Sequence, residues 1–133
     1  VRHQNRLGVL YARYGMYDEA EGVFASIVAE TAYGPAIVNL ANLRYRQGRL
    51  YDALDLYRQA LALHPESPDL LVMTARVAYE AGEYEEAEAL ANRVAERYPD
   101  RLENHPYLTS SDGGGDRAAV PEDIQGQVTW VEE

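Results

Sequence analysis

The chain has 133 residues, a formal net charge of −10 and no cysteine. Hydrophobic residues make up 47% of it, which suits one compact domain and argues against a wholly disordered chain. The acidic balance argues against nucleic acid as a partner, the lack of cysteine excludes disulfides and thiolate metal sites, and no apolar run approaches the ~20 residues that cross a bilayer. We therefore expect no nucleic-acid binding and no direct membrane insertion by this chain.

A short phrase occurs three times along the first hundred residues. It begins at Gly15, Gly48 and Gly82, has an aromatic residue or leucine two positions later, and ends in an alanine after acidic residues. The glycine supplies the positive φ that ends one helix, and the acidic residues fall in the first turn of the next helix, where the helix dipole favours them. Each phrase therefore predicts a helix, a tight turn and a second, antiparallel helix.

Apolar residues on both sides of each phrase follow helical spacing, as Ala20, Phe24 and Ile27 do after the first one. Proline also marks the helix boundaries, because Pro35 and Pro68 fall in first turns. The sequence predicts six helices, near residues 2–14, 17–31, 35–47, 51–63, 68–81 and 84–98.

This pattern resembles the tetratricopeptide repeat family, which has a small residue in each helix and Leu, Tyr, Phe and Pro at fixed offsets. The resemblance covers residues 1 to about 99, with repeats near 1–34, 35–67 and 68–101 in a domain of residues 1–104. It departs from the family pattern at Gln4, where the family has tryptophan, and at Ala91, where a larger aromatic is usual. The resemblance implies an all-α, right-handed superhelical array of three helix-turn-helix pairs that acts as a scaffold for a protein or peptide partner.

In this family the first helix of each pair lines a concave groove. Residues about a quarter turn from Gly8, Ala41 and Ala75, which face the partner helix, should point into it. The predicted peptide-binding residues are Asn5, Val9, Arg13, Val38, Asn39, Asn42, Tyr45, Arg46, Val72, Arg76 and Tyr79. Arginine and amide groups favour an extended, acidic segment as the ligand, whereas the alternative is that these arginines are merely solvated.

Residues 105–133 change character. A stretch rich in Ser, Gly and Asp is typical of a linker, and an apolar and acidic segment follows it, in which Ile124, Val128, Trp130 and Val131 are the predicted docking residues. Family arrays usually end in a capping helix, but here proline and glycine follow the last repeat. The tail could therefore lie in its own groove, cover the uncapped last helix or join a neighbouring copy as a homo-oligomer, or it could have no docking role.

The sequence contains no catalytic constellation, and we expect neither enzymatic activity nor a cofactor or metal. The three histidines, His3, His64 and His105, lie in different segments and are predicted to be ordinary exposed residues. Two alternatives to a binding scaffold stay open: an assembly unit joined through the tail or the uncapped last helix, and a regulatory fragment of a larger enzyme. The start at Val1, directly inside a repeat, favours a fragment, and a cytoplasmic location is favoured.

Overall fold

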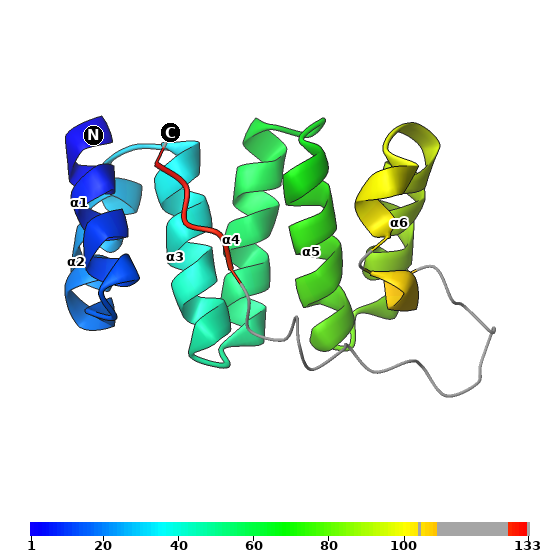
Figure 1. Ribbon diagram of the computed structural model, residues 1–133, viewed down its shortest axis with the longest axis horizontal. Coiled ribbons are helices and arrows are strands. Elements are labelled where there is room, and N and C mark those ends of the chain that lie inside the picture. Colours follow the sequence, from blue (N-terminus) through cyan, green and yellow to red (C-terminus); the bar gives the residue numbers. More distant parts are fainter. Residues whose placement is uncertain (104, 109–127, 133) are drawn as a thin grey trace.

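The computed structural model describes residues 1–103, 105–108 and 128–132 (Figure 1). It contains six α-helices and two short 3₁₀ helices: α1 (Arg2–Arg13), α2 (Tyr17–Glu30), α3 (Gly34–Arg46), α4 (Leu50–Leu63), α5 (Pro68–Glu80), α6 (Tyr84–Arg97), η1 (Pro99–Leu102) and η2 (Pro106–Leu108). No strand occurs in the described ranges. The all-α prediction is confirmed, and every predicted helix boundary lies within one residue of the observed one.

The helices form three antiparallel pairs, α1 with α2, α3 with α4 and α5 with α6. The pairs stand in a row, because α2 packs on α3 and α4 packs on α5 (Figure 1). Each element thus contacts its neighbours in the sequence, as expected for a repeat array in which stability comes from adjacent units.

The three repeated glycines end the first helix of each pair in the same way. Gly15, Gly48 and Gly82 have φ values of 76°, 79° and 87°. No other residue in the described ranges has a positive φ. In the first turn the amide of Met16 donates to the carbonyl of Tyr11 over 2.8 Å, the six-to-one bond of a Schellman motif, and the other two turns repeat it. The repeated phrase is therefore a helix stop that reverses the chain.

Close approach of the two helices in a pair depends on a small residue in the first helix. A Cβ atom placed on Gly8 would lie 2.4 Å from the ring of Phe24 in α2, too close for any real contact. Ala41 and Ala75 occupy the equivalent places in α3 and α5 and are fully buried. These small residues set the helix–helix distance, as the sequence predicted.

The last helix pair is covered by the residues that follow it. Leu102, Tyr107 and Leu108 are buried against α5 and α6, and the Tyr107 ring lies 5.0 Å from that of Tyr79. All buried apolar side chains of the described ranges belong to residues 9–108, and Val128, Trp130 and Val131 pack against them as partly buried side chains. His105 is half-buried beside Tyr107, and the expectation that all three histidines are exposed is wrong for this one.

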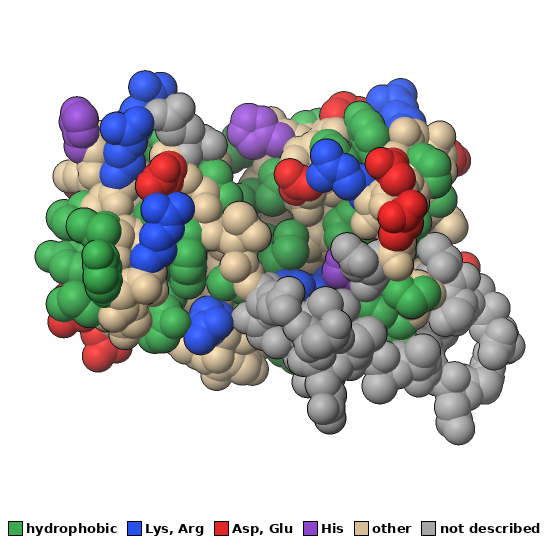
Figure 2. Space-filling model, in the orientation of Figure 1, with side chains coloured by type: hydrophobic (Ala, Val, Ile, Leu, Met, Phe, Trp, Pro, Cys, Tyr) green, Lys and Arg blue, Asp and Glu red, His purple; other side chains and the backbone are tan. Residues whose placement is uncertain are grey.

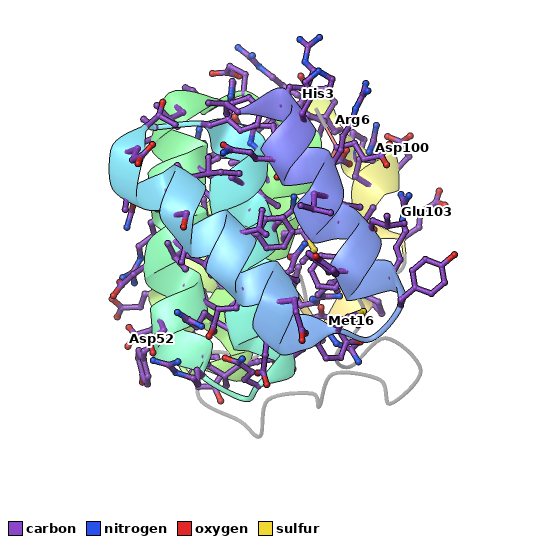
Figure 3. All side chains as sticks on the ribbon, turned by 90° about the vertical axis from the view of Figure 1, so that its left-hand side faces the viewer. His3, Arg6, Met16, Asp52, Asp100 and Glu103 are labelled. Atoms are coloured by element: carbon purple, nitrogen blue, oxygen red, sulfur yellow. The ribbon has the colours of Figure 1, made fainter. Side chains whose placement is uncertain are left out.

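The opposite end of the array is less well covered (Figure 3). Leu7 and Leu10 of α1 are 44% and 50% exposed, whereas Leu40 and Leu43, at the same places in α3, are 5% and 1% exposed. The difference arises because α2 covers α3, and no described helix covers the corresponding face of α1. No helix in the described ranges is both long and apolar enough to cross a membrane.

Candidate functional site: the groove on the first helices

The groove is lined by the first helices of the pairs, and residues 128–132, called here the tail segment, lie in it. The tail segment is irregular and runs across α3 (Figure 1). The tail segment accepts hydrogen bonds from residues of α1 and α3 that lie between 87 and 127 positions earlier in the sequence. The groove and the tail segment thus form one site from the two ends of the chain.

Three asparagines of α1 and α3, called here the asparagine row, bind the main chain of the tail segment. Asn39 both donates to the Val131 carbonyl over 2.7 Å and accepts from the Val131 amide over 2.8 Å. Asn5 donates to the same carbonyl over 2.8 Å, and Asn42 donates to the Thr129 carbonyl over 2.9 Å. Asn5 also donates to the Glu132 carbonyl over 3.1 Å. The described residues thus show five hydrogen bonds between the asparagine row and the main chain of the tail segment.

The orientation of these amides is fixed by bonds within the helical body. Asn39 donates to the side-chain oxygen of Asn5 over 2.9 Å, and Tyr57 of α4 donates to the side-chain oxygen of Asn42. Burial raises the pKa of the Tyr57 hydroxyl well above its usual value, so this group remains a donor at any physiological pH. With their oxygens occupied, Asn5 and Asn42 must present their NH₂ groups to the tail segment.

The asparagine row is buried, at 0% exposure for Asn5 and Asn39 and 1% for Asn42. A buried amide that loses its partner bears a desolvation cost, so these groups need an acceptor or water in the groove. Asn39 lies one position beyond the α3 residue equivalent to Asn5, because the first two repeats are offset by 33 residues and these two asparagines are 34 apart. The row therefore binds the main chain of the tail segment without being a strict repeat of one position.

The side chains of the tail segment enter two different apolar clusters. Trp130 packs against the cluster of α1, α2 and α3 that contains Val9, and its ring lies 6.4 Å from that of Tyr17. Val128 and Val131 pack against the larger cluster that contains Val38 and Val72. Residues 130 and 131 thus pack against different clusters.

Charge contributes one described ion pair to this contact. Arg13 lies 3.1 Å from the Glu132 carboxylate, with the two side chains 53% and 48% exposed. An exposed pair of this kind contributes ~0.2–1 kcal/mol and weakens with salt. Arg46 contacts the site indirectly, because its guanidinium lies 5.1 Å above the ring of Tyr17.

A hollow of about 1020 Å³ remains beside the tail segment, between α3 and α5. Thr129 and Val131 line it together with apolar side chains such as Leu70 and Met73. Figure 2 shows this face of the molecule hollowed near its middle. The edge of the hollow carries Arg2, His64 and the ion pair of Asp69 with Arg101. The tail segment therefore fills only part of the groove.

Three of the predicted groove residues lie in a buried cluster instead of on an open surface. Tyr45, Arg76 and Tyr79 are 5%, 4% and 8% exposed. Tyr45 donates to Glu80 over 2.5 Å, the Arg76 guanidinium lies 4.9 Å from the Tyr45 ring, and Tyr79 packs on aromatic neighbours. These side chains brace the α3–α5 wall of the groove.

Among the predicted tail residues, Val128, Trp130 and Val131 contact the body, and Ile124 lies outside the described residues. Sequence reasoning did not identify two contributors from second helices, Tyr17 and Tyr57. Tyr17 sits in the repeated phrase, where its spacing indicated only a turn, and Tyr57 fell on the packing stripe. In the described ranges no group of His, Asp or Glu side chains is placed to hold a metal ion.

Comparison with known proteins agrees with this architecture. Residues 44–105 match the tetratricopeptide repeat family model. The human protein O-mannosyl-transferase TMTC1 is 29% identical over 104 residues, which is 78% of this chain but only 12% of that protein. The type III secretion chaperone SycD of Yersinia enterocolitica, solved in complex with a peptide of the translocator YopD, superposes with a TM-score of 0.66 at 20% identity and covers 80% of this chain and 85% of its own. Three helix pairs closed by the same glycine turn, together with the match over residues 44–105, show tetratricopeptide-type repeats in this chain.

Proposed function

We propose that this chain is a protein-interaction scaffold whose groove binds an extended polypeptide through its main chain, and that the tail segment occupies the groove in the intact chain. The observation that carries the proposal is the contact of Asn39 with both the amide and the carbonyl of Val131. A side-chain amide that pairs with both groups of one residue recognises a main chain in extended conformation, whatever side chain that residue carries.

The peptide-bound state of SycD supports the proposal by analogy of fold, since it is a tetratricopeptide-like structure that holds a peptide. The resemblance to TMTC1 spans an eighth of that longer protein and does not carry its transferase activity to this chain. The groove contains polar groups suited to hold a peptide, and it is proposed as a binding surface without catalytic activity.

Acidic side chains of the ligand contribute less to the proposed binding than its main chain does. The five main-chain hydrogen bonds are each worth ~0.5–1.5 kcal/mol net, and the asparagines that make them are buried. The exposed ion pair of Arg13 with Glu132 contributes less than any two of them. Affinity should therefore come from main-chain bonds and apolar contact, and acidity should tune it.

Trp130 is the only tryptophan and reports directly on the tail segment. Its emission should be blue-shifted and protected from iodide or acrylamide, and it should stay so across a dilution series if the tail segment binds its own body. Loss of the shift on dilution would instead indicate docking on a neighbouring molecule, which is the assembly alternative. A chain ending at Ser110 should show the same helical content by circular dichroism and the size of a monomer. Emission like that of free tryptophan at every concentration would refute docking.

A further inference from the structure

We infer that the groove selects partner segments that carry a tryptophan followed by a β-branched residue and a glutamate, the pattern of residues 130–132, and that such a segment displaces the tail segment. This inference rests on the proposed function, since it names the ligand class of the same groove. The partner is a segment of another protein, and the tail segment is its built-in competitor.

The main-chain bonds fix the register of any ligand. Asn39 holds both groups of the residue at the place of Val131, and Asn42 holds the carbonyl two residues earlier. A slip by one residue would exchange the two faces of the ligand, because side chains alternate along an extended chain. The residue that precedes the one on Asn39 must therefore direct its side chain toward the cluster that receives Trp130.

That receiving place, called here the aromatic slot, is shaped for a large flat side chain. Its floor is the buried apolar cluster of α1, α2 and α3, and its wall is the ring of Tyr17, which lies 6.4 Å from the Trp130 ring at an interplanar angle of 36°. Arg46 lies against the Tyr17 ring and holds this wall in place. The described contacts of Trp130 are with apolar and aromatic side chains, so a polar side chain in the slot would lose water without gaining a partner there.

The residues after the tryptophan have narrower requirements. At the place of Val131 the side chain packs against the larger apolar cluster, which suits a β-branched residue that also favours an extended chain. At the place of Glu132 the carboxylate meets Arg13 in a half-exposed position. Thr129 is exposed and contributes through its carbonyl, so its side chain should be free to vary.

The test uses the chain ending at Ser110, which retains the buried apolar side chains of residues 9–108, and fluorescently labelled peptides of residues 126–133. Replacing tryptophan in the peptide by alanine (Trp130→Ala) should weaken binding by about 30-fold or more, the loss typical of an interface hot spot. Trp130→Phe should recover most of the affinity. Glu132→Gln should cost about 2- to 5-fold and lose its effect at high salt. A peptide of the same composition in scrambled order is the control for non-specific binding.

On the protein side, Tyr17→Ala should weaken binding of the natural peptide but not of the Trp130→Ala peptide, which would localise the effect to the aromatic slot. Tyr14→Ala, whose side chain is 76% exposed, is the control for loss of a tyrosine. In the intact chain, an excess of the Trp130→Phe peptide, which adds no tryptophan emission of its own, should shift the emission of Trp130 toward that of free tryptophan.

The outcomes separate the two proposals. If all peptides bind with equal affinity, main-chain recognition stands and selection by the aromatic slot is wrong. If the natural peptide fails to bind the folded chain ending at Ser110 even at millimolar concentration, the proposed function itself is wrong. Because the decisive changes are made in the peptide, neither outcome can be explained by misfolding of the protein.

Discussion

The asparagine row and the ion pair of Arg13 contribute separately to the affinity of the groove for the tail segment. Substitution of Asn39 measures the contribution of the asparagine row. Asn39→Ala removes two hydrogen bonds to Val131, one donated and one accepted. At ~1 kcal/mol for each bond, docking of the tail segment should weaken by about 2 kcal/mol, which is roughly 30-fold. Arg13→Gln removes an ion pair whose members are 53% and 48% exposed and should cost about 5-fold at most.

The measurement is the Kd of the labelled peptide of residues 126–133 for the chain ending at Ser110, in three forms: unchanged, Asn39→Ala and Arg13→Gln. Anisotropy measured at 50 and 300 mM salt separates the contribution of the Asn39 hydrogen bonds from that of the Arg13 ion pair, because salt screens only the ion pair. Thermal unfolding of each variant checks that the body is intact, since Asn39 also donates to Asn5. A larger loss from Arg13→Gln than from Asn39→Ala, with affinity falling steeply with salt, would refute main-chain recognition as the main source of affinity.

Three further predictions concern the body that carries the groove. Gly8→Ala should destabilise the fold by ~1–3 kcal/mol in denaturant unfolding, because the new Cβ would overlap the Phe24 ring of α2. Gly22→Ala has open space around the new Cβ and should stabilise α2 by up to ~1 kcal/mol. Equal effects of the two substitutions on the free energy of unfolding would contradict this difference in packing. Tyr57→Phe should weaken peptide binding by about 5-fold, because the Asn42 amide loses the donor that orients it, and unchanged affinity would show that orientation is fixed otherwise. Burial and the nearby Arg76 charge lower the pKa of His105 in the folded chain. As the pH falls below 6.5, the ordinary pKa of histidine, the unfolded chain takes up the proton first, so the free energy of unfolding should decline. His105→Gln should make that decline less steep, and an unchanged slope would exclude His105 as its cause.

The helices were predictable to within a residue because their ends carry strong local signals. Each first helix stops at a glycine with positive φ, and two first helices begin with proline in the first turn. These signals act over two or three residues and depend little on the rest of the fold. The period of 33 to 34 residues then arranges the pairs, because each unit repeats the contacts of the one before it.

The groove was predictable only in part. Helical geometry put Asn5, Asn39 and Asn42 among the residues expected on the inner face, and arginine and amide groups together suggested an acidic ligand. The structure instead gives most of the hydrogen bonds to the amides and one ion pair to Arg13. The amide contacts could not be foreseen from composition because they recognise the main chain, which is the same for every sequence.

The burial of Tyr45, Arg76 and Tyr79 has a different cause. Residues 106–108 fold back on α5 and α6, and Tyr107 packs against Tyr79. This short 3₁₀ segment has no periodicity, and the proline and glycine around it indicate a linker. Its packing depends on the surface that α5 and α6 present after they have folded, and a local pattern does not contain that information.

Occupation by the tail segment has a quantitative consequence for any partner. A site that binds a main chain binds its own tail as readily as another protein, and a tethered segment competes without dilution. The Kd of a partner for the intact chain is then its Kd for the open groove divided by the fraction of molecules in which the groove is open. The ratio of the Kd values for the intact chain and for the chain ending at Ser110 therefore gives the docking equilibrium of the tail segment directly. Asn39→Ala weakens tail and partner alike and should leave the intact chain's Kd far less changed than that of the shortened chain, because the lost affinity for the partner is offset by the larger open fraction.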